Sequence, residues 1–297
     1  MRWLSDSTLE HLRRAADWPD LAGTRYRALD VLGRGGMGTV YRVEDGELGR
    51  EVALKVLRDP ELAPQAIERM LREARVLARL EHPGIVPVHD VGRLPDGRAY
   101  YAMKLVRGTR LDRHLGAAVP LRERLRIFQR ICEAVAFAHA HGVIHRDLKP
   151  QNVMLGPFGE VLVLDWGLAK ELQGAEPAAD PEATLVESPA AAAITAQGTV
   201  LGTPAYLSPE QARGEVASID ARTDVWALGA ILYCLLTGKP PLDAATAAQA
   251  REQLERAAIV PPRRRGALVP RRLEAICLRA LALAPAERYA DVEQLSA

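Results

Sequence analysis

A glycine-rich segment near the start of the chain has the spacing of a phosphate-binding loop. Residues 33–40 follow the pattern G-x-G-x-x-G-x-V. Because glycine has no Cβ, backbone N–H groups in such a segment can approach phosphate oxygens closely. The run after the glycines indicates a strand and not a helix, and no Gly-Lys-Ser/Thr follows, which excludes a dinucleotide-binding turn and a Walker loop. Taken alone, the segment predicts a glycine-rich hairpin over phosphates or an ordinary glycine turn.

A lysine and a glutamate follow this segment at a spacing that suits a paired charge. Lys55 ends the apolar run Val-Ala-Leu-Lys. A strand lysine usually faces solvent, but one placed beyond a glycine hairpin suggests a cation that faces phosphates. Such a lysine needs a carboxylate to hold it, and Glu73 in the helical pattern of residues 64–80 is the favoured candidate. Glu68 is the weaker alternative.

Three further motifs lie in the second half of the chain. Residues 145–152 read His-Arg-Asp-Leu-Lys-Pro-Gln-Asn, a match that chance rarely produces. Residues 165–167 read Asp-Trp-Gly, and residues 203–210 read Thr-Pro-Ala-Tyr-Leu-Ser-Pro-Glu. Together they supply carboxylate and amide oxygens, which suit a hard cation such as Mg²⁺, and a second lysine.

The elements that must position these residues change character along the chain. Short β-branched runs separated by glycine-rich segments predict strands at 26–32, 39–44, 51–57, 86–92 and 99–105, the last two joined by a turn at 95–97. Helical periodicity predicts helices at 7–16, 64–80, 121–141, 219–237, 243–257 and 270–282. Residues 172–197 are rich in Ala, Pro, Glu, Ser and Thr without periodicity, so a flexible loop is expected there.

Composition excludes several classes of protein. The chain has 297 residues, with 48 % hydrophobic and 26 % charged residues, which is typical of globular domains. The net charge of +1 gives no bulk reason to expect nucleic acid as a partner. Three cysteines in apolar helical stretches predict reduced core thiols. No apolar run is long enough to span a membrane, and no signal-peptide pattern is found, so a cytoplasmic location is expected.

In their order and spacing, the motifs at 33–40, 52–55, 145–152, 165–167 and 203–210 resemble those of bacterial eukaryotic-like (Hanks-type) serine/threonine protein kinases. The resemblance covers about residues 26–297. It implies an α+β, bilobal protein-kinase fold, with a small five-stranded antiparallel N-lobe carrying one main helix and a larger, mostly helical C-lobe. The implied boundaries are an N-terminal helical extension at 1–23 and a kinase domain at 24–297, divided into an N-lobe (about 24–104), a hinge (104–107), a C-lobe (108–297) and an activation segment (165–210).

The resemblance also implies a role for each motif, with ATP between the two lobes. Lys55 would contact the α- and β-phosphates and pair with Glu73. Asp165 and Asn152 would hold Mg²⁺, with Mn²⁺ as an alternative ion. Asp147 would accept the proton of the substrate hydroxyl, and Lys149 would neutralise charge on the transferred group. The implied ATP contacts are Leu32, Gly33, Arg34, Gly35, Gly36, Met37, Gly38, Thr39, Val40, Ala53, Lys55, Met103, Lys104, Val106 and Met154.

Substrate class and regulation follow from the same comparison. Lys149 and Thr203 are the forms found in serine/threonine kinases, so protein substrates with Ser or Thr hydroxyls are expected. Arg146 would bind a phosphate on the activation loop, with Thr195 as the first candidate phosphosite and Thr199 as the second. A dimer for autophosphorylation is an open alternative.

Structural roles and departures complete the implied pattern. Asp224 would anchor the catalytic loop, and Glu210 and Arg288 would form a buried ion pair. Trp166 replaces the usual Phe, Lys104 an acid and Ser208 an alanine, but no core catalytic residue is missing. The leading interpretation is an ATP-dependent protein kinase in bacterial signalling. A pseudokinase that binds nucleotide as a scaffold is the alternative, and a small-molecule kinase is less favoured because of the peptide-docking segment.

Overall fold

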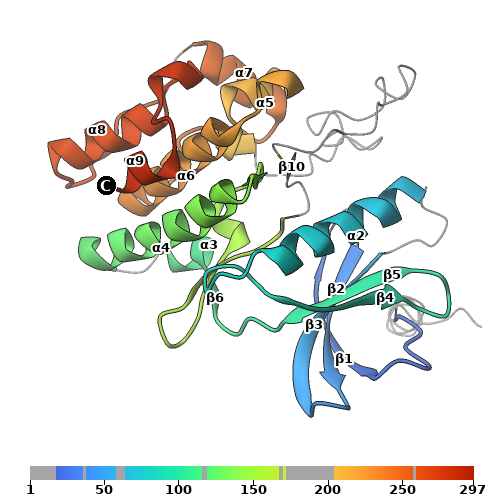
Figure 1. Cartoon of the computed structure of the whole chain (residues 1–297). Helices are drawn as coiled ribbons and strands as arrows, with labels where there is room; N and C mark the ends of the chain where they lie inside the picture. The colour runs from blue at the N-terminus through green and yellow to red at the C-terminus, as the bar shows by residue number, and fades with distance from the viewer. Residues whose placement is uncertain are drawn as a thin grey trace, which may run out of the picture. The chain divides into compact units, whose positions relative to one another are not determined.

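The computed structural model describes residues 18–35, 38–57, 64–115, 119–166, 170–171, 204–256 and 259–297. These residues form two compact units (Figure 1). The first unit comprises described residues of Met1–Ala78 together with Pro87–Val106, and the second comprises Arg79–Val86 and the chain from Arg107 onward. Residues 79–86, which the sequence prediction placed in the N-lobe, therefore group with the second unit. The helix predicted at 7–16 and the loop predicted at 172–197 lie outside the described residues.

The first unit is a five-stranded antiparallel sheet with one long helix, as predicted. Its strands, in spatial order, are β1 (Tyr26–Arg34), β2 (Gly38–Asp45), β3 (Arg50–Leu57), β5 (Ala99–Lys104) and β4 (Val88–Arg93). The helix is α2 (Pro64–Arg79). Gly97 has a φ of 85° and its N–H donates to the Leu94 carbonyl, which confirms the turn between β4 and β5.

The two faces of this sheet bury different sets of side chains. On one face, mostly tyrosines and valines of β1, β2, β3 and β5 form a core that includes Tyr41, Leu54 and Tyr100. On the other face, Leu57, Ala99 and Tyr101 pack with Met70 and Ala74 of α2. Because side chains alternate along a strand, Lys55 points to the same face as Tyr101 and α2. The helix that carries Glu73 thus packs on the face to which Lys55 belongs.

The second unit is mostly helical. Its α-helices are α3 (Leu111–His114), α4 (Leu121–Ala140), α5 (Pro209–Ala212), α6 (Ala221–Thr237), α7 (Ala247–Glu255), α8 (Arg271–Ala280) and α9 (Val292–Ser296). Its 3₁₀ helices are η1 (Pro150–Asn152), η3 (Pro204–Tyr206), η4 (Val216–Ser218), η5 (Pro262–Arg265) and η6 (Pro285–Glu287). Short strands complete the unit, with β6 (Thr109–Arg110), β8 (Val153–Leu155) and β9 (Val161–Val163) in one sheet and β7 (Val143–Ile144) paired with β10 (Lys170–Glu171).

Helix α6 is the centre of this unit, because every residue from Thr223 to Leu236 is buried. It begins at Ala221 and not at 219, since the Asp220 side chain accepts the Arg222 N–H and caps the first turn. Helix α7 likewise begins at Ala247, capped by Thr246, and not at 243. The short strands of the second unit were not predicted, because two or three residues carry no periodic signal.

Two expectations about composition can be checked in the described residues. Cys132, Cys234 and Cys277 are all buried and free, and burial raises the pKa of each thiol. Within the same residues, every helix is too short or too polar to cross a membrane.

Candidate active site

In the first unit, Glu73 is the centre of a small buried cluster. Lys55 Nζ lies 2.9 Å from Glu73 Oε1 and 3.2 Å from Oε2. The Tyr101 hydroxyl donates to Glu73 Oε1 at 2.8 Å, and the lysine ammonium lies 5.5 Å from the centre of the Tyr101 ring. The Glu73 side chain is 2 % exposed and that of Lys55 12 %. The ammonium is therefore fixed on the sheet face by a carboxylate that is itself held by a phenol, and Glu68 is not the partner.

Strand register brings several predicted ATP contacts onto the face of Lys55. Val40 of β2 and Tyr101 of β5 lie opposite Lys55, and Met103 lies opposite Ala53 two residues away. Val40, Ala53, Lys55 and Met103 therefore share one face of the sheet, although they come from three strands. Ala53 is buried, whereas Val40 and Met103 are half-buried.

The glycine-rich segment forms the hairpin between β1 and β2. The Gly35 N–H donates to the Gly38 carbonyl at 2.9 Å, which links the residue after β1 to the first residue of β2. A Cβ on Gly38 would lie 2.4 Å from the Val56 carbonyl oxygen, so glycine is required for β2 to pair with β3. A Cβ on Gly33 would meet nothing within 4 Å. The two glycines thus have different roles, one in strand pairing and one in leaving the backbone accessible.

Other predicted contacts of this segment are more exposed. Leu32 is 48 % exposed and lies where the β1–β2 register shifts. Gly33, Arg34 and Gly35 are exposed, and Thr39 is buried. Gly36 and Met37 lie outside the described residues.

At the end of β5, one backbone group of Lys104 is already used by a hydrogen bond within the first unit. The Lys104 N–H donates to the Pro87 carbonyl at 3.1 Å. Of the two backbone groups of Lys104, only the carbonyl can therefore meet the edge of a base. Lys104 is exposed and Val106 half-buried.

In the second unit, Asp147 lies in a loop whose side chains converge on its carboxylate. Lys149 Nζ is 2.9 and 2.8 Å from the two Asp147 oxygens. Asn152 Nδ2 donates to the Asp147 carbonyl at 2.8 Å and to its carboxylate at 3.2 Å. These bonds orient the Asn152 amide so that Nδ2 is used as a donor and Oδ1 remains as the oxygen that can bind a cation.

A buried aspartate on α6 fixes the start of this loop. Asp224 accepts the backbone N–H groups of His145 at 2.7 Å and Arg146 at 2.8 Å, and lies 2.8 Å from His139 Nε2. Burial alone would raise the pKa of Asp224, but its hydrogen bonds and the positive charge nearby outweigh burial and hold the pKa below its usual value. Asp224 thus holds the start of the loop from the core through two backbone hydrogen bonds.

The loop also contains backbone strain. Among the described residues, the non-glycine positions with left-handed φ are Arg146, at 70°, and Asp165, at 59°. Such a conformation costs on the order of 1–3 kcal/mol and tends to occur at active sites. Gln211 of α5 donates to the Arg146 carbonyl at 2.7 Å, which supports this strained residue from outside the loop. Strain therefore lies at two of the three predicted motifs of this unit, those at 145–152 and 165–167.

Asp165 follows a strand that is tied to the same loop. The Leu164 N–H donates to the Asn152 carbonyl at 2.8 Å, and its carbonyl lies 3.0 Å from His145 Nε2. Asp165 is exposed, whereas Trp166 is 1 % exposed and packs on the His145 ring. Two hydrogen bonds and a ring contact thus place Asp165 next to the loop of Asp147 and Asn152. Met154, the predicted base contact of this unit, lies on β8 and is half-buried.

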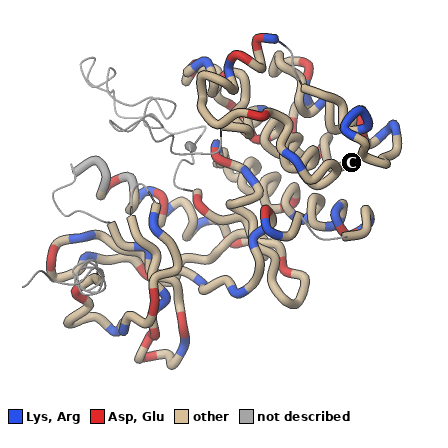
Figure 2. Tube along the Cα trace, turned by 180° about the vertical axis from the view of Figure 1, so that it is seen from behind, with Lys and Arg blue, Asp and Glu red and all other residues tan. Residues whose placement is uncertain are grey.

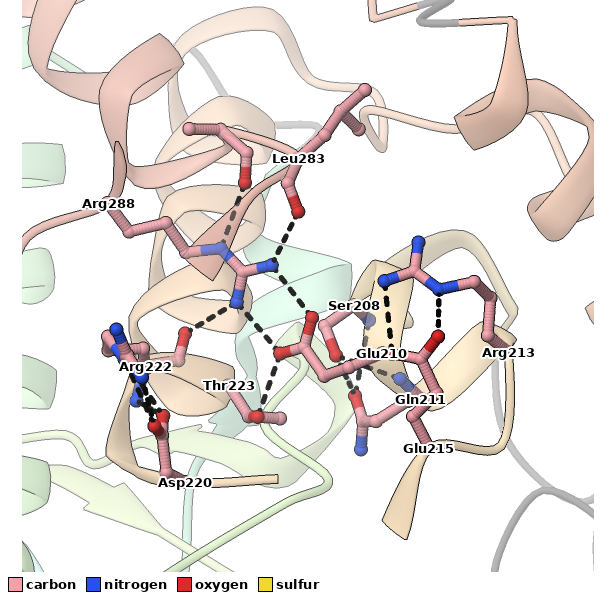
Figure 3. A network of polar contacts seen from close by, with 11 residues as sticks. Ser208, Glu210, Gln211, Arg213, Glu215, Asp220, Arg222, Thr223, Leu283 and Arg288 are labelled. Atoms are coloured by element: carbon pink, nitrogen blue, oxygen red, sulfur yellow. Dashed lines mark hydrogen bonds and ion pairs between the residues drawn. The ribbon is translucent and has the colours of Figure 1, made fainter. Parts of the chain in front are cut away.

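Glu210 and Arg288 form a buried ion pair in the second unit (Figure 3). The Arg288 Nη1 and Nη2 atoms each lie 2.8 Å from a Glu210 oxygen, and the two side chains are 0 % and 1 % exposed. Arg288 also donates to the carbonyls of Ala282, Arg222 and Leu283. Burial alone would raise the pKa of Glu210, but the bonds and charge of Arg288 outweigh it, so the pKa lies below its usual value.

Some predicted residues could not be placed, and others were missed. Thr195, Thr199 and Thr203 lie outside the described residues. Sequence reasoning missed four polar partners in the network, namely Tyr101, His139, Gln211 and Thr223, which donates to Glu210 at 2.8 Å. Each stands in an apolar or helical run where a polar side chain gives no signal of its partner.

Comparison with known proteins agrees with this geometry. The protein kinase domain family model matches residues 26–295. The serine/threonine-protein kinase PknB of Mycolicibacterium smegmatis is 39 % identical over 285 residues, which cover 94 % of this chain and 43 % of that protein. PknD of Protochlamydia amoebophila, also a serine/threonine-protein kinase, is 38 % identical, over 91 % of this chain and 29 % of that protein.

A third relative comes from Deinococcus radiodurans. The DNA damage-responsive serine/threonine-protein kinase RqkA is 44 % identical over 225 residues, which cover 74 % of this chain and 31 % of that protein. The chain thus spans less than half the length of these curated relatives. Since the family model covers nearly the whole chain and the motifs lie where the fold requires them, the chain belongs to the protein kinase domain family.

Proposed function

We propose that this chain is an ATP-dependent serine/threonine protein kinase of bacterial signalling, located in the cytoplasm. The observation that carries the proposal is the Asp147 carboxylate, which Lys149 and Asn152 contact in a loop anchored on buried Asp224. A carboxylate held in this way can accept a proton from a hydroxyl that is aligned for transfer.

In this proposal, residues of the first unit bind the nucleotide. Lys55 contacts the α- and β-phosphates, because Glu73 and Tyr101 hold its ammonium in one position. The exposed backbone of Gly33 and Gly35 approaches the phosphates without a Cβ in the way. The adenine packs against Leu32, Val40, Ala53 and Met103, and its edge meets the backbone of Lys104, through the carbonyl, and of Val106.

A divalent cation is part of the proposal, and the donor set fits one. The Asn152 Oδ1 and the carboxylate of Asp165 are hard oxygen ligands of the kind that Mg²⁺ prefers. We propose Mg²⁺, with Mn²⁺ as the alternative ion. When bound, the ion supplies positive charge that neutralises the phosphate oxygens. Asp165 and Asn152 orient it, and they are tied together through the Leu164 N–H.

The residues of this chain contribute to the reaction by positioning the substrate hydroxyl and by placing positive charge next to the transferred phosphoryl group. Asp147 Oδ accepts a hydrogen bond from the substrate hydroxyl, orients its oxygen and takes its proton as the phosphoryl group is transferred. Lys149, between the Asp147 oxygens, places a cation next to the transferred group. The buried anchoring of the loop means that little reorganisation accompanies the reaction.

Substrate class and regulation are proposed from the motifs. Lys149 and Thr203 favour Ser and Thr hydroxyls of protein substrates over Tyr. Arg146 binds a phosphate on the activation segment, at Thr195 or, as a second choice, at Thr199. Mass spectrometry after incubation with ATP tests this: a phosphate at either threonine is expected, and none between residues 168 and 201 contradicts it.

One experiment tests the activity. The native chain and Asp147→Asn are incubated with labelled ATP and Mg²⁺ and with a Ser/Thr peptide. We expect label in the peptide with the native chain only, and phosphoserine or phosphothreonine on acid hydrolysis. Binding of an ATP analogue by calorimetry should be retained in Asp147→Asn, because that residue faces the hydroxyl. Equal label in both proteins contradicts the kinase activity, and binding without transfer by the native chain supports the pseudokinase alternative.

A further inference from the structure

A stretch of the second unit is rich in arginine and contains no acidic residue. Residues 256–273 contain no Asp or Glu. Five arginines lie between Pro262 and Leu273, and we call them with Leu268 the arginine patch: Arg263, Arg264, Arg265, Arg271 and Arg272. Figure 2 shows Lys and Arg gathered at this end of the second unit, near the C-terminus.

The two halves of the patch lie next to each other in space. The Arg263 N–H in η5 donates to Glu274 Oε2 in the first turns of α8 at 2.7 Å. This bond brings η5 against the N-terminal end of α8, so arginines from both elements belong to one surface. Arg263, Arg264, Arg271 and Arg272 are exposed.

Several arginines elsewhere in the second unit are neutralised by ion pairs, such as Arg213 with Glu215, Arg222 with Asp220 and Arg251 with Glu255. Within the described ranges, no carboxylate lies within 4.0 Å of the four exposed patch guanidinium groups. The central side chain, Leu268, is 100 % exposed. A surface with several unpaired cations around an exposed leucine fits an acidic segment that contains an apolar residue.

This chain itself contains such a segment. Residues 171–187 include five acids, Glu171, Glu176, Asp180, Glu182 and Glu187, and no Lys or Arg. Leu185 and Val186 lie between the last two acids. We call residues 171–187 the acidic segment. Residues 172–187 are outside the described part of the chain, so only their sequence enters the argument.

The arrangement of the second unit favours a segment from another copy. Strand β10, at which the acidic segment begins, and helix α5, which follows it in the chain, lie at the end of the unit opposite to α8 (Figure 1). We therefore propose that the arginine patch binds the acidic segment of a second copy of this chain. Bound in this way, one copy would hold the activation segment of another as a substrate, a consequence that rests on the proposed kinase function.

Self-association of the full chain is the first test, and it needs no catalysis. We compare the native chain with the patch variant Arg264→Glu/Arg271→Glu and the control variant Arg122→Glu/Arg130→Glu, whose sites are exposed on α4. Both variants make the same change in charge, and Arg122 and Arg271 both lie in the first turn of a helix, where Glu is favoured. In sedimentation velocity at low salt, only the patch variant should lose association, by about tenfold in Kd. Equal losses in both variants overturn the proposal.

Charge exchange identifies the occupant. The segment variant Glu176→Lys/Glu182→Lys should fail to self-associate, because its segment repels the patch. A mixture of the segment variant and the patch variant should associate again, since the native patch of the first then meets the native segment of the second, and the reversed patch meets the reversed segment. No recovery in the mixture overturns the proposal and points to a different acidic partner.

The proposal also predicts which copy must carry each variant to lower phosphate transfer between copies. A general loss of stability would not depend on the copy in this way. An active copy is mixed with an Asp147→Asn copy of different size, and label in the inactive copy is measured. The patch variant should lower the label when the active copy carries it, but not when the inactive copy carries it. The segment variant should lower the label when the inactive copy carries it, but not when the active copy does. The rate on a short peptide should stay unchanged. If association follows the predictions but no peptide is labelled, the proposed function fails and the docking proposal stands.

Discussion

The indole of Trp166 packs against the imidazole of His145, with ring centroids 4.6 Å apart and ring planes tilted by 50°. His145 is fully buried and connects the catalytic loop to the backbone of Leu164. Trp166 Nε1 also donates to the Val163 carbonyl at 3.4 Å. The bulky residue that departs from the family pattern is therefore accommodated in the core, next to the proposed metal ligand Asp165.

This packing predicts that Trp166 acts on both stability and phosphate transfer. Trp166→Ala should cost about 3–5 kcal/mol of unfolding free energy, because it leaves a large cavity. Trp166→Phe keeps most of the ring contact and should cost less, but should lower kcat, since Asp165 is the adjacent residue. Trp226→Phe is the control, because Trp226 is a buried residue of α6 whose indole N–H has no partner among the described residues. An unchanged kcat in Trp166→Phe would contradict a positioning role.

Tyr101 should matter to nucleotide use through Glu73. Tyr101→Phe removes the hydroxyl that donates to Glu73 Oε1, and a bond to a charged group contributes about 1.5–3 kcal/mol. We expect a loss of stability in that range by urea unfolding and a higher KM for ATP, because Glu73 holds Lys55 less firmly. Tyr100→Phe is the matched control on the other face of β5, and it should leave KM unchanged. Equal effects of the two variants would argue against the cluster.

The sequence predicted the pair of Lys55 and Glu73 but not the third member of the cluster. A lysine beyond a glycine hairpin needs a carboxylate to hold it, and this requirement pointed to a glutamate of the helical pattern at 64–80. A tyrosine in an apolar strand is typical of any core, so Tyr101 gave no sign of its hydrogen bond. His139 was hidden in the same way on α4. These roles depend on cross-strand register and helix packing, which the period of a single strand or helix does not determine.

Two Arg–Glu ion pairs with the same distance but different exposure allow the effect of burial on stability to be tested. Arg288 and Glu210 are buried at 2.8 Å, and Arg251 and Glu255 lie at 2.8 Å with both side chains 57 % exposed. Arg288→Ala should destabilise the chain by about 3–5 kcal/mol, because the Glu210 charge stays buried without its partner. Arg251→Ala should cost about 0.5 kcal/mol or less. Chemical unfolding measures both, and similar costs would contradict a dominant effect of burial.

At acid pH, the contribution of ionised Glu210 to the stability of the folded chain should be lost. Its pKa is lower in the folded chain than its usual 4.5, so the stabilisation is complete above pH 4.5 and is lost as pH falls through the folded pKa. Glu210→Gln should therefore lower Tm at neutral pH. The difference in Tm from the native chain should shrink as the pH falls below 4.5 and through the lowered pKa, where Glu210 of the folded chain itself becomes neutral. A difference that stays constant down to acid pH would contradict the lowered pKa.

Substitutions of Gly38 and Gly33 in the hairpin should affect different properties, the first the stability of the chain and the second nucleotide binding. Gly38→Ala places a Cβ 2.4 Å from the Val56 carbonyl oxygen, which cannot move without breaking the pairing of β2 and β3. We expect a loss of about 1–3 kcal/mol in urea unfolding, the usual cost of overpacking. Gly33→Ala meets open space and should keep or slightly raise stability, because alanine has less freedom in the unfolded chain. Its binding of an ATP analogue should nevertheless weaken, since the new Cβ stands where the backbone would approach a phosphate. Calorimetry on both variants decides the assignment, and native affinity in Gly33→Ala would mean that this glycine serves only the turn.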